Sequence, residues 1–284
     1  VRSVMFAGEG EPMLHTDIVE HVLLCKASGI DVSFTTNATI ISDKFIENGL
    51  ENTTWIKVSL NAGCEDTYAK IHQTKKDDFS KVIENLKNLV TEKKSRSLNC
   101  TIGVQILLLP ENKDEIEQLV LLARDEIGLD YVVVKPYSQH KFSETRIYEG
   151  IDYSSFSLMG RHLSAHETDT FKVVFRGETI RKLNEGPESR YKKCHATPFF
   201  WAYVMADGAV YGCSAYLLDE KFKYGNLHDS SFKEIWEGEG RRRSLEFVQN
   251  HLDISDCRIN CRMDEVNRYL DNLANNTVAH VNFI

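Results

Sequence analysis

Short apolar stretches alternate with longer amphipathic ones from Val1 to Tyr137. This rhythm predicts repeated βα units around a parallel sheet. The expected strands are rich in Val, Ile, Thr and Phe: Ser3–Ala7, Asp31–Thr36, Trp55–Leu60, Cys100–Leu108 and Tyr131–Lys135. The expected helices between them are Thr16–Ala27, Ser42–Asn48, Phe79–Lys93 and Lys113–Glu126. The fold class is therefore α/β, as a full or partial (β/α) barrel or an open doubly wound sheet.

The pattern changes after Tyr137. Residues 138–190 are irregular and polar, and we interpret them as a linker region over the barrel mouth. Residues 191–284 predict a small α+β domain, because Asp207-Gly208 between the apolar runs Phe199–Met205 and Ala209–Tyr211 is typical of a hairpin. Two helices are expected to complete this domain, at Ser231–Trp236 and Met263–Ala274. Three regions result: a barrel over 1–137, the linker over 138–190 and the second domain over 191–284.

The charge and hydropathy of the chain indicate which kinds of ligand it can bind. The chain has 34 basic and 42 acidic residues, a net charge of −8 and no long basic run, which argues against general nucleic-acid binding. Its longest aliphatic run, Ile106 to Leu109, stops at Pro110, far short of the roughly 20 residues that span a bilayer. We expect no signal peptide, because the first residues lack a cationic region followed by an apolar run. We expect a cytoplasmic protein that binds a small ligand, with no membrane partner.

The cysteines provide the strongest local signal. Cys25, Cys64 and Cys100 are dispersed in apolar or helical contexts and are interpreted as ordinary thiols. The other four, in the last third of the chain, are Cys194, Cys213, Cys257 and Cys261. Four thiolates converge most naturally on one tetrahedral site, and soft sulfur ligands select zinc or an iron–sulfur cluster. On the residues alone, zinc, a cluster and free thiols all remain open.

Polar residues at the expected strand ends form a second candidate site. Gly8-Glu9-Gly10-Glu11-Pro12 follows the first strand, where glycines allow close approach to a ligand and Glu11 could bind an amino group; a simple strand-to-helix turn is the alternative. Further candidates end the later strands: Thr36, Asn37, Ser59, Asn61, Gln105, Lys135, Tyr137 and His140. Lys135 and His140 are the candidate acid–base residues, although a charge pair and a solvated loop histidine would explain them equally.

Taken together, these motifs resemble the radical S-adenosylmethionine superfamily, in particular members with a C-terminal twitch or SPASM domain. The segment from Gly8 to Pro12 is similar to the family's GGEP motif, which holds the methionine amino group. The resemblance implies that the cofactor S-adenosylmethionine is also bound by residues at the later strand ends: Thr36, Asn37, Ser59, Asn61, Gln105, Lys135 and Tyr137. It also implies a [4Fe–4S] auxiliary cluster on the four C-terminal cysteines, with zinc kept as the alternative.

The same resemblance implies a reaction. In this family a 5′-deoxyadenosyl radical abstracts hydrogen from the substrate, and a fully cysteine-ligated auxiliary cluster could accept the remaining electron. We therefore expect a two-electron oxidation, a dehydrogenation of a small molecule such as a sugar or cyclitol. The alternatives are a maturase that modifies a peptide and a non-catalytic zinc-binding scaffold. A flavodoxin or ferredoxin is the expected electron donor.

One family motif is absent from the sequence. The radical-generating cluster of the family is held by a Cys-x-x-x-Cys-x-x-Cys loop after the first barrel strand, and no such triplet occurs here. Val1 falls where the second strand of the family would begin. We therefore expect a partial barrel without its first βα unit, a second [4Fe–4S] cluster on the preceding segment, and no activity from this chain alone.

Overall fold

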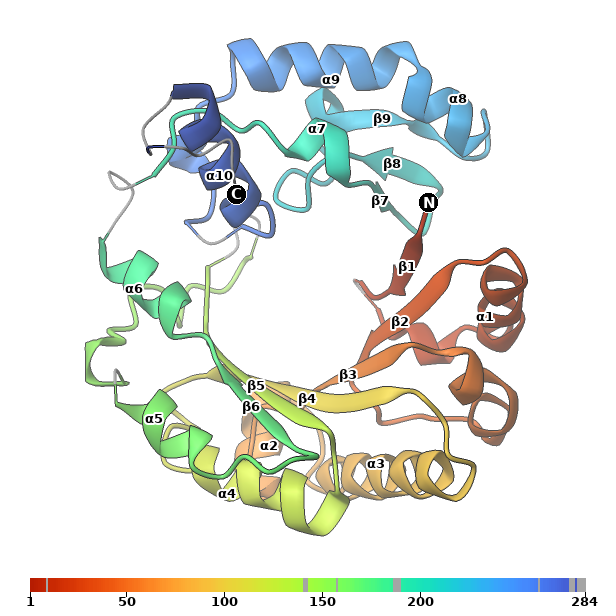
Figure 1. Ribbon diagram of the computed structural model, residues 1–284, viewed down its shortest axis with the longest axis vertical. Helices are drawn as coiled ribbons and strands as arrows, with labels where there is room; N and C mark the ends of the chain where they lie inside the picture. Colours follow the sequence, from red (N-terminus) through yellow and green to blue (C-terminus); the bar gives the residue numbers. More distant parts are fainter. Residues whose placement is uncertain are drawn as a thin grey trace. The chain divides into compact units, whose positions relative to one another are not determined.

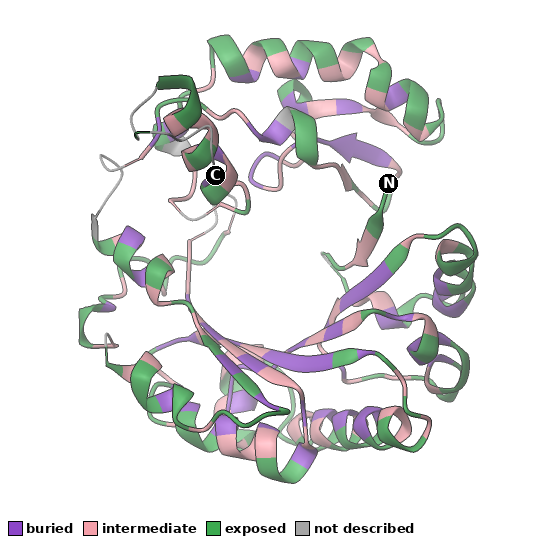
Figure 2. Cartoon of the chain, viewed as in Figure 1, coloured by how far each residue is buried: buried purple, intermediate pink, exposed green. Residues whose placement is uncertain are grey.

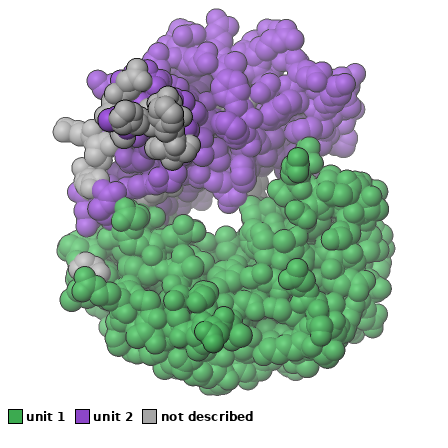
Figure 3. Space-filling model, viewed as in Figure 1, with its two compact units in different colours: residues 1–137, 151–180 green, residues 138–150, 181–284 purple. Residues whose placement is uncertain are grey.

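The computed structural model describes residues 1–8, 10–139, 143–156, 158–185, 190–259, 261–275 and 279. The chain divides into two compact units, which Figure 3 shows in different colours. Unit 1 comprises Val1–Tyr137 and Ile151–Ile180, and unit 2 comprises Ser138–Gly150 and Arg181–Ile284. Each unit has its own sheet and is described separately below.

Unit 1 is built on a six-stranded parallel sheet. Its strands are β1 (Ser3–Phe6), β2 (Asp31–Thr36), β3 (Trp55–Ser59), β4 (Thr101–Leu108), β5 (Tyr131–Pro136) and β6 (Lys172–Phe175). Every neighbouring pair is parallel, and the spatial order follows the chain from β1 to β6. A doubly wound sheet reverses its strand order at a switch point, whereas a (β/α) barrel adds strands in sequence. The order therefore confirms the α/β class and identifies a partial barrel (Figure 1).

Helices cover one face of this sheet. They are η1 (Pro12–Leu14), α1 (Ile18–Ala27), η2 (Phe45–Gly49), η3 (Leu50–Asn52), α2 (Glu65–His72), α3 (Asp77–Ser95), α4 (Ile116–Leu121), η4 (Leu122–Ile127), η5 (Ser154–Phe156) and α5 (Met159–Ser164), whereas α6 (Gly177–Glu185) begins in unit 1 and ends in unit 2. The longest, α3, buries a stripe of Val82, Leu86, Leu89 and Val90. It begins with acidic and ends with basic residues, which complements the helix dipole.

The two faces of the sheet differ in polarity. Residues paired in register point the same way, and alternate residues of a strand share a face. One face carries Phe34, Val58, Val104 and Val134, all fully buried. Figure 2 shows buried residues along the strands and on the helices beside them. The opposite face carries most of the polar side chains of the central strands, and Thr36 adds a polar group at the end of the helix-covered face.

The predicted linker over 138–190 is partly wrong. Residues 151–180 belong to unit 1, and β6 within them pairs in parallel with β5. The strand β6 was missed because its four residues lie among polar neighbours, where no alternation can be recognised. The short helix α2 was also missed, because only Tyr68 on it is buried and the apolar stripe is therefore incomplete.

Unit 2 contains a three-stranded antiparallel sheet in the order β7 (Tyr203–Val204), β8 (Ala209–Tyr211) and β9 (Lys223–Asn226). The predicted hairpin is confirmed, with Gly208 at a φ of 79° in the turn. Residues Thr197–Phe200 are helical rather than the start of its first strand, because Pro198 sits where a helix begins. The helices are α7 (Thr197–Phe200), η7 (Glu220–Phe222), α8 (Phe232–Glu237), α9 (Glu239–Asn250), η8 (Ile254–Asp256) and α10 (Asp264–Asn275).

The helices were searched for segments able to cross a bilayer. Within the described residues, none combines the length and the apolar character that a membrane span requires.

The loop after β4 depends on one buried amide. Asn112 is fully buried; its side-chain oxygen accepts from Leu109 N–H at 2.9 Å, and its Nδ2 donates to the carbonyls of Asn61 and Leu107, both at 2.7 Å. We expect Asn112→Ala to lower the free energy of unfolding by about 3 kcal/mol, because three backbone groups lose their partner. Urea denaturation measures this. The exposed Asn48→Ala is the control, and an equal effect of both variants would contradict the account.

Candidate cluster and cofactor sites

The four C-terminal cysteines of unit 2 line one pocket. Cys213 follows β8, Cys257 follows η8, Cys261 precedes α10, and Cys194 precedes α7. The pocket wall includes the buried aromatic rings of Tyr191, Tyr216 and Phe222 together with Leu252 and Ile254. The structure therefore brings together the four thiols that the sequence singled out, in largely apolar surroundings.

Burial sets the protonation of these thiols. It raises the pKa of Cys213 to about 12, with the neighbouring thiols Cys194, Cys257 and Cys261 adding to the effect. Burial also raises the pKa of Cys257 and of Cys261, partly offset by hydrogen bonds from Tyr216 and Tyr191. Without a bound metal the pocket thus favours neutral thiols, and a cation that takes up thiolates would remove that cost.

The spacing of the thiols bears on which metal they fit. In the described residues, the only group of three or more His, Cys, Asp or Glu ligand atoms lying within 4.8 Å of one another is Glu117, His162 and His166. No three of the cysteine sulfurs approach that closely. A tetrahedral zinc site with Zn–S of about 2.3 Å would place its sulfurs about 3.8 Å apart. Four thiolate donors in apolar surroundings fit an iron–sulfur cluster, and the sulfurs would have to move closer together to bind a single zinc ion.

Polar side chains around the pocket contact the sulfurs. Asn267 is fully buried; its Oδ1 accepts from the backbone N–H groups of His195 and Ala196 at 2.6 and 2.9 Å, and its Nδ2 lies 3.5 Å from Cys194 Sγ. The Tyr191 hydroxyl is 3.8 Å from Cys261 Sγ, and the Tyr216 hydroxyl is 3.6 Å from Cys257 Sγ. Sequence reasoning missed all three residues, and no local motif marks them.

An arginine fixes the segment that carries Cys257. Arg190 Nη1 donates to the carbonyls of Ile254 and Cys257 at 3.2 and 3.0 Å. Its guanidinium also lies over the ring of Tyr191. This link places a permanent positive charge beside the thiols.

In unit 1 the loop after β1 is tied to the end of β2 through Glu11. The Glu11 carboxylate accepts from Met13 N–H at 3.0 Å, from the Thr36 hydroxyl at 2.5 Å and from Asn37 N–H at 2.7 Å. Pro12 begins the short helix η1 that follows. Both carboxylate oxygens accept hydrogen bonds within the protein, and Oε2, which accepts one, can still accept from a bound amino group.

The remaining strand-end candidates occupy two environments. Ser59 pairs in register with Gln105, and Leu107 with Lys135, so Ser59, Gln105 and Lys135 share the polar face of the sheet. Lys57 shares that face and was missed, although its alternation with Ile56 and Val58 was a usable signal. Asn61 is buried instead, and its Oδ1 accepts from Leu107 N–H at 2.8 Å, so it bridges β3 and β4.

Three further candidates remain to be placed. Tyr137 directly follows β5, and its backbone N–H donates to the Tyr153 hydroxyl at 2.8 Å. Glu9 and His140 lie outside the described residues.

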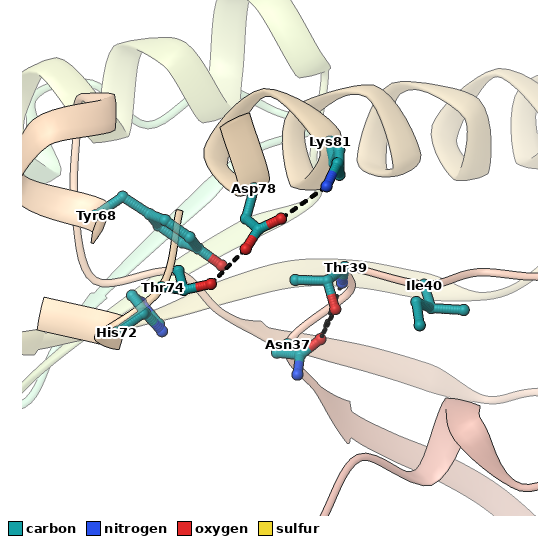
Figure 4. Close-up of a pocket in the computed structure, with 8 residues that line it drawn as sticks. All are labelled: Asn37, Thr39, Ile40, Tyr68, His72, Thr74, Asp78 and Lys81. Atoms are coloured by element: carbon teal, nitrogen blue, oxygen red, sulfur yellow. Dashed lines mark hydrogen bonds and ion pairs between the residues drawn. The ribbon is translucent and has the colours of Figure 1, made fainter. Parts of the chain in front are cut away.

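A cavity of about 340 Å³ lies beside Asn37, between the ends of β2 and α2 and the start of α3 (Figure 4). Within it His72 stacks on Tyr68 at 4.2 Å and accepts from Asn61 N–H at 3.3 Å, and burial lowers the pKa of His72. Hydrogen bonds from Lys81 and Thr74 lower the pKa of Asp78 to about 2. The cavity therefore presents a neutral imidazole and a paired carboxylate next to a predicted cofactor residue.

Comparison with protein families identifies both units. Residues 1–123 match the model of the radical SAM superfamily, and residues 194–262 match the SPASM iron–sulfur cluster-binding domain. The chain therefore carries a radical SAM domain over residues 1–123 and a C-terminal SPASM-like domain over residues 194–262. The predicted resemblance is thus confirmed, and S-adenosylmethionine and [4Fe–4S] clusters are the cofactors that these two domains imply.

Individual relatives match only in part. A probable GTP 3′,8-cyclase of Saccharolobus solfataricus is 40% identical over 91 residues, which cover 32% of this radical SAM chain and 29% of the relative. A probable GTP 3′,8-cyclase of Saccharolobus islandicus gives the same values. The match thus spans less than a third of the length of these curated relatives.

Solved structures confirm the fold over a longer stretch. SuiB of Streptococcus suis superposes with a TM-score of 0.58 at 20% identity, covering 84% of this chain and 55% of SuiB. The structure titled native anSMEcpe with bound AdoMet gives a TM-score of 0.57 at 20% identity, covering 87% of this chain and 68% of that one. At this identity the likeness shows a shared fold.

The Glu11 contacts yield a test. We expect Thr36→Val to lower the free energy of unfolding by about 1–3 kcal/mol, because it removes the hydroxyl donor to a carboxylate without changing side-chain volume. Hydrogen exchange at the Met13 amide should accelerate. Thr35→Val, on the opposite face of the same strand, is the matched control. Unchanged exchange at Met13 in Thr36→Val would show that the loop does not depend on this contact.

Proposed function

We propose that this chain is the larger part of a radical SAM oxidoreductase that removes two electrons from its substrate. A [4Fe–4S] cluster on Cys194, Cys213, Cys257 and Cys261 would serve as electron acceptor. The observation that carries the proposal is the convergence of these four thiols in one pocket, within the segment that matches an iron–sulfur cluster-binding domain. Cysteine at all four positions leaves no open site for substrate, which suits electron transfer rather than substrate binding.

The residues of unit 1 would hold S-adenosylmethionine. The backbone at Gly8 and Gly10, in the loop that Glu11 fixes, would receive the amino group. Ser59, Gln105 and Lys135 on the polar face, with Thr36, Asn37, Asn61 and Tyr137 at neighbouring strand ends, would complete the site. When bound, S-adenosylmethionine supplies hydrogen-atom abstraction, and the auxiliary cluster accepts one electron.

The electron balance requires a base. A two-electron oxidation removes a hydrogen atom, a proton and an electron from the substrate. Of the two predicted acid–base residues, Lys135 is the one the structure describes, on the polar face at the end of β5. Lys135, as the neutral amine, would take the proton and release it to solvent, and a flavodoxin or ferredoxin would supply the electron that starts each turnover.

The substrate we favour is a peptide side chain. Two structures that superpose on more than four fifths of this chain are titled as SuiB bound to its precursor peptide SuiA and anSMEcpe bound to the Kp18Cys peptide. The sugar or cyclitol predicted from the sequence is the second candidate. The two candidate substrates can be distinguished with a preparation that also carries the radical-generating cluster. We expect 5′-deoxyadenosine to form when the substrate peptide is added and not when sugars or cyclitols are added. The reverse result would select the small molecule.

Removal of one ligand tests the cluster. After anaerobic reconstitution with iron and sulfide, we expect Cys213→Ser to lose most of the bound iron and the visible charge-transfer absorbance, since a serine hydroxyl is a poor substitute for a soft thiolate. Cys25→Ser removes a thiol outside the pocket and should keep both signals. If both variants load equally, or the wild-type chain takes up zinc and no iron, the chain is instead a zinc-binding scaffold.

A further inference from the structure

A second cluster of metal-ligating side chains lies in unit 1, apart from the cysteine pocket. His162 and His166 each place Nε2 at 2.8 Å from the same oxygen, Oε1 of Glu117. The three ligand atoms all lie within 4.8 Å of one another. Neither the radical SAM chemistry nor the cysteine quartet uses these residues.

The chain holds the three side chains in place through its core. Glu117 lies in the first turn of α4, whose Ile116, Leu119 and Val120 are buried. His162 lies on α5 and His166 in the turn after it, four residues on, so their rings can face the same point. The His166 carbonyl accepts from Arg124 Nη1 at 3.2 Å, which ties the end of α5 to η4. The cluster therefore links two helices that are each anchored independently.

We propose that Glu117, His162 and His166 form a divalent transition-metal site, with Zn²⁺ as the preferred ion. Two imidazole nitrogens and one carboxylate oxygen match the ligands that zinc takes when a fourth position is left to water. Imidazole disfavours Mg²⁺ and Ca²⁺, which prefer oxygen ligands alone. The proposal is independent of the function proposed above.

To admit the ion, each imidazole must present an Nε2 lone pair, so the proton that each Nε2 donates to Glu117 must move to Nδ1, and the ligand atoms must separate slightly. With metal–ligand distances of about 2.1 Å, a tetrahedral site would separate nitrogen and oxygen by about 3.4 Å, so each 2.8 Å contact must open by roughly half an ångström. The side chains of His162 and Glu117 are 62% and 46% exposed and can move, while His166, at 20%, is the fixed ligand.

The local charge is compatible with a cation. Hydrogen bonds from the two imidazoles lower the pKa of Glu117, so its carboxylate is ionised at neutral pH. The nearby Arg124 guanidinium is paired with Asp125 through contacts of 2.6 and 2.8 Å, which offsets its positive charge. An ion here would join α4, which follows β4, to α5, which precedes the edge strand β6, and so would stabilise the last βα unit of the sheet.

Cadmium NMR tests the site and separates it from the cysteine pocket. We expect the reduced 284-residue chain with excess ¹¹³Cd²⁺ to show a resonance in the nitrogen–oxygen range, distinct from any far-downfield thiolate resonance. Glu117→Gln, which keeps the size of the side chain, and the double variant His162→Ala/His166→Ala should lose the first resonance only. In both variants Zn²⁺ affinity at this site should fall by roughly tenfold or more.

His228→Ala, in the hairpin region of unit 2, is the matched control and should keep the resonance. The proposal is overturned if excess cadmium gives no nitrogen–oxygen resonance in the wild-type chain. It is also overturned if that resonance survives in both Glu117→Gln and the double variant, because the cluster would then be an ion pair only. The presence or absence of the thiolate resonance reports separately on the cysteines.

Discussion

Four thiols from separate stretches of unit 2 must share one apolar pocket, and much of that unit is arranged around this requirement. The β7–β8 hairpin delivers Cys213, Asn267 of α10 holds the backbone next to Cys194, and Arg190 binds the carbonyl of Cys257. Burial raises the pKa of Cys213, Cys257 and Cys261, so deprotonating these thiols without a metal costs free energy. A cluster that binds the four thiolates would offset this free-energy cost and contribute to the stability of the unit.

The sheet of unit 1 carries most of its polar side chains on one face. Sequential parallel strands leave the helix-covered face apolar apart from Thr36 at the end of β2, while Ser59, Gln105 and Lys135 line up on the other face through their register. The loop after β1 is held to β2 by the Glu11 carboxylate rather than left free. The same carboxylate that suggested ligand binding in the sequence thus positions the backbone that a ligand would meet.

Local patterns were enough to predict the strands β1 to β5 and the Asp207-Gly208 hairpin, because each is encoded within a short stretch of chain. The four C-terminal cysteines could be singled out by residue type and spacing. The edge strand β6, which is as short as β1, was missed because it lies within a polar, irregular stretch, and the helix α2 was missed because only Tyr68 on it is buried. The roles of Asn267 and Tyr191, and the hydrogen bonds that Glu11 accepts from Thr36 and Asn37, could not be predicted. Their roles depend on contacts between residues far apart in the sequence, which only the folded chain shows.

The identity of the metal in the cysteine pocket tests the central claim most directly. Native mass spectrometry of the anaerobically reconstituted chain, with iron, acid-labile sulfide and zinc quantified in the same sample, measures it. The account predicts a mass increase corresponding to one [4Fe–4S] cluster per chain, with iron and sulfide in equal amounts. One zinc ion per chain, bound through the same cysteines and without sulfide, would contradict it.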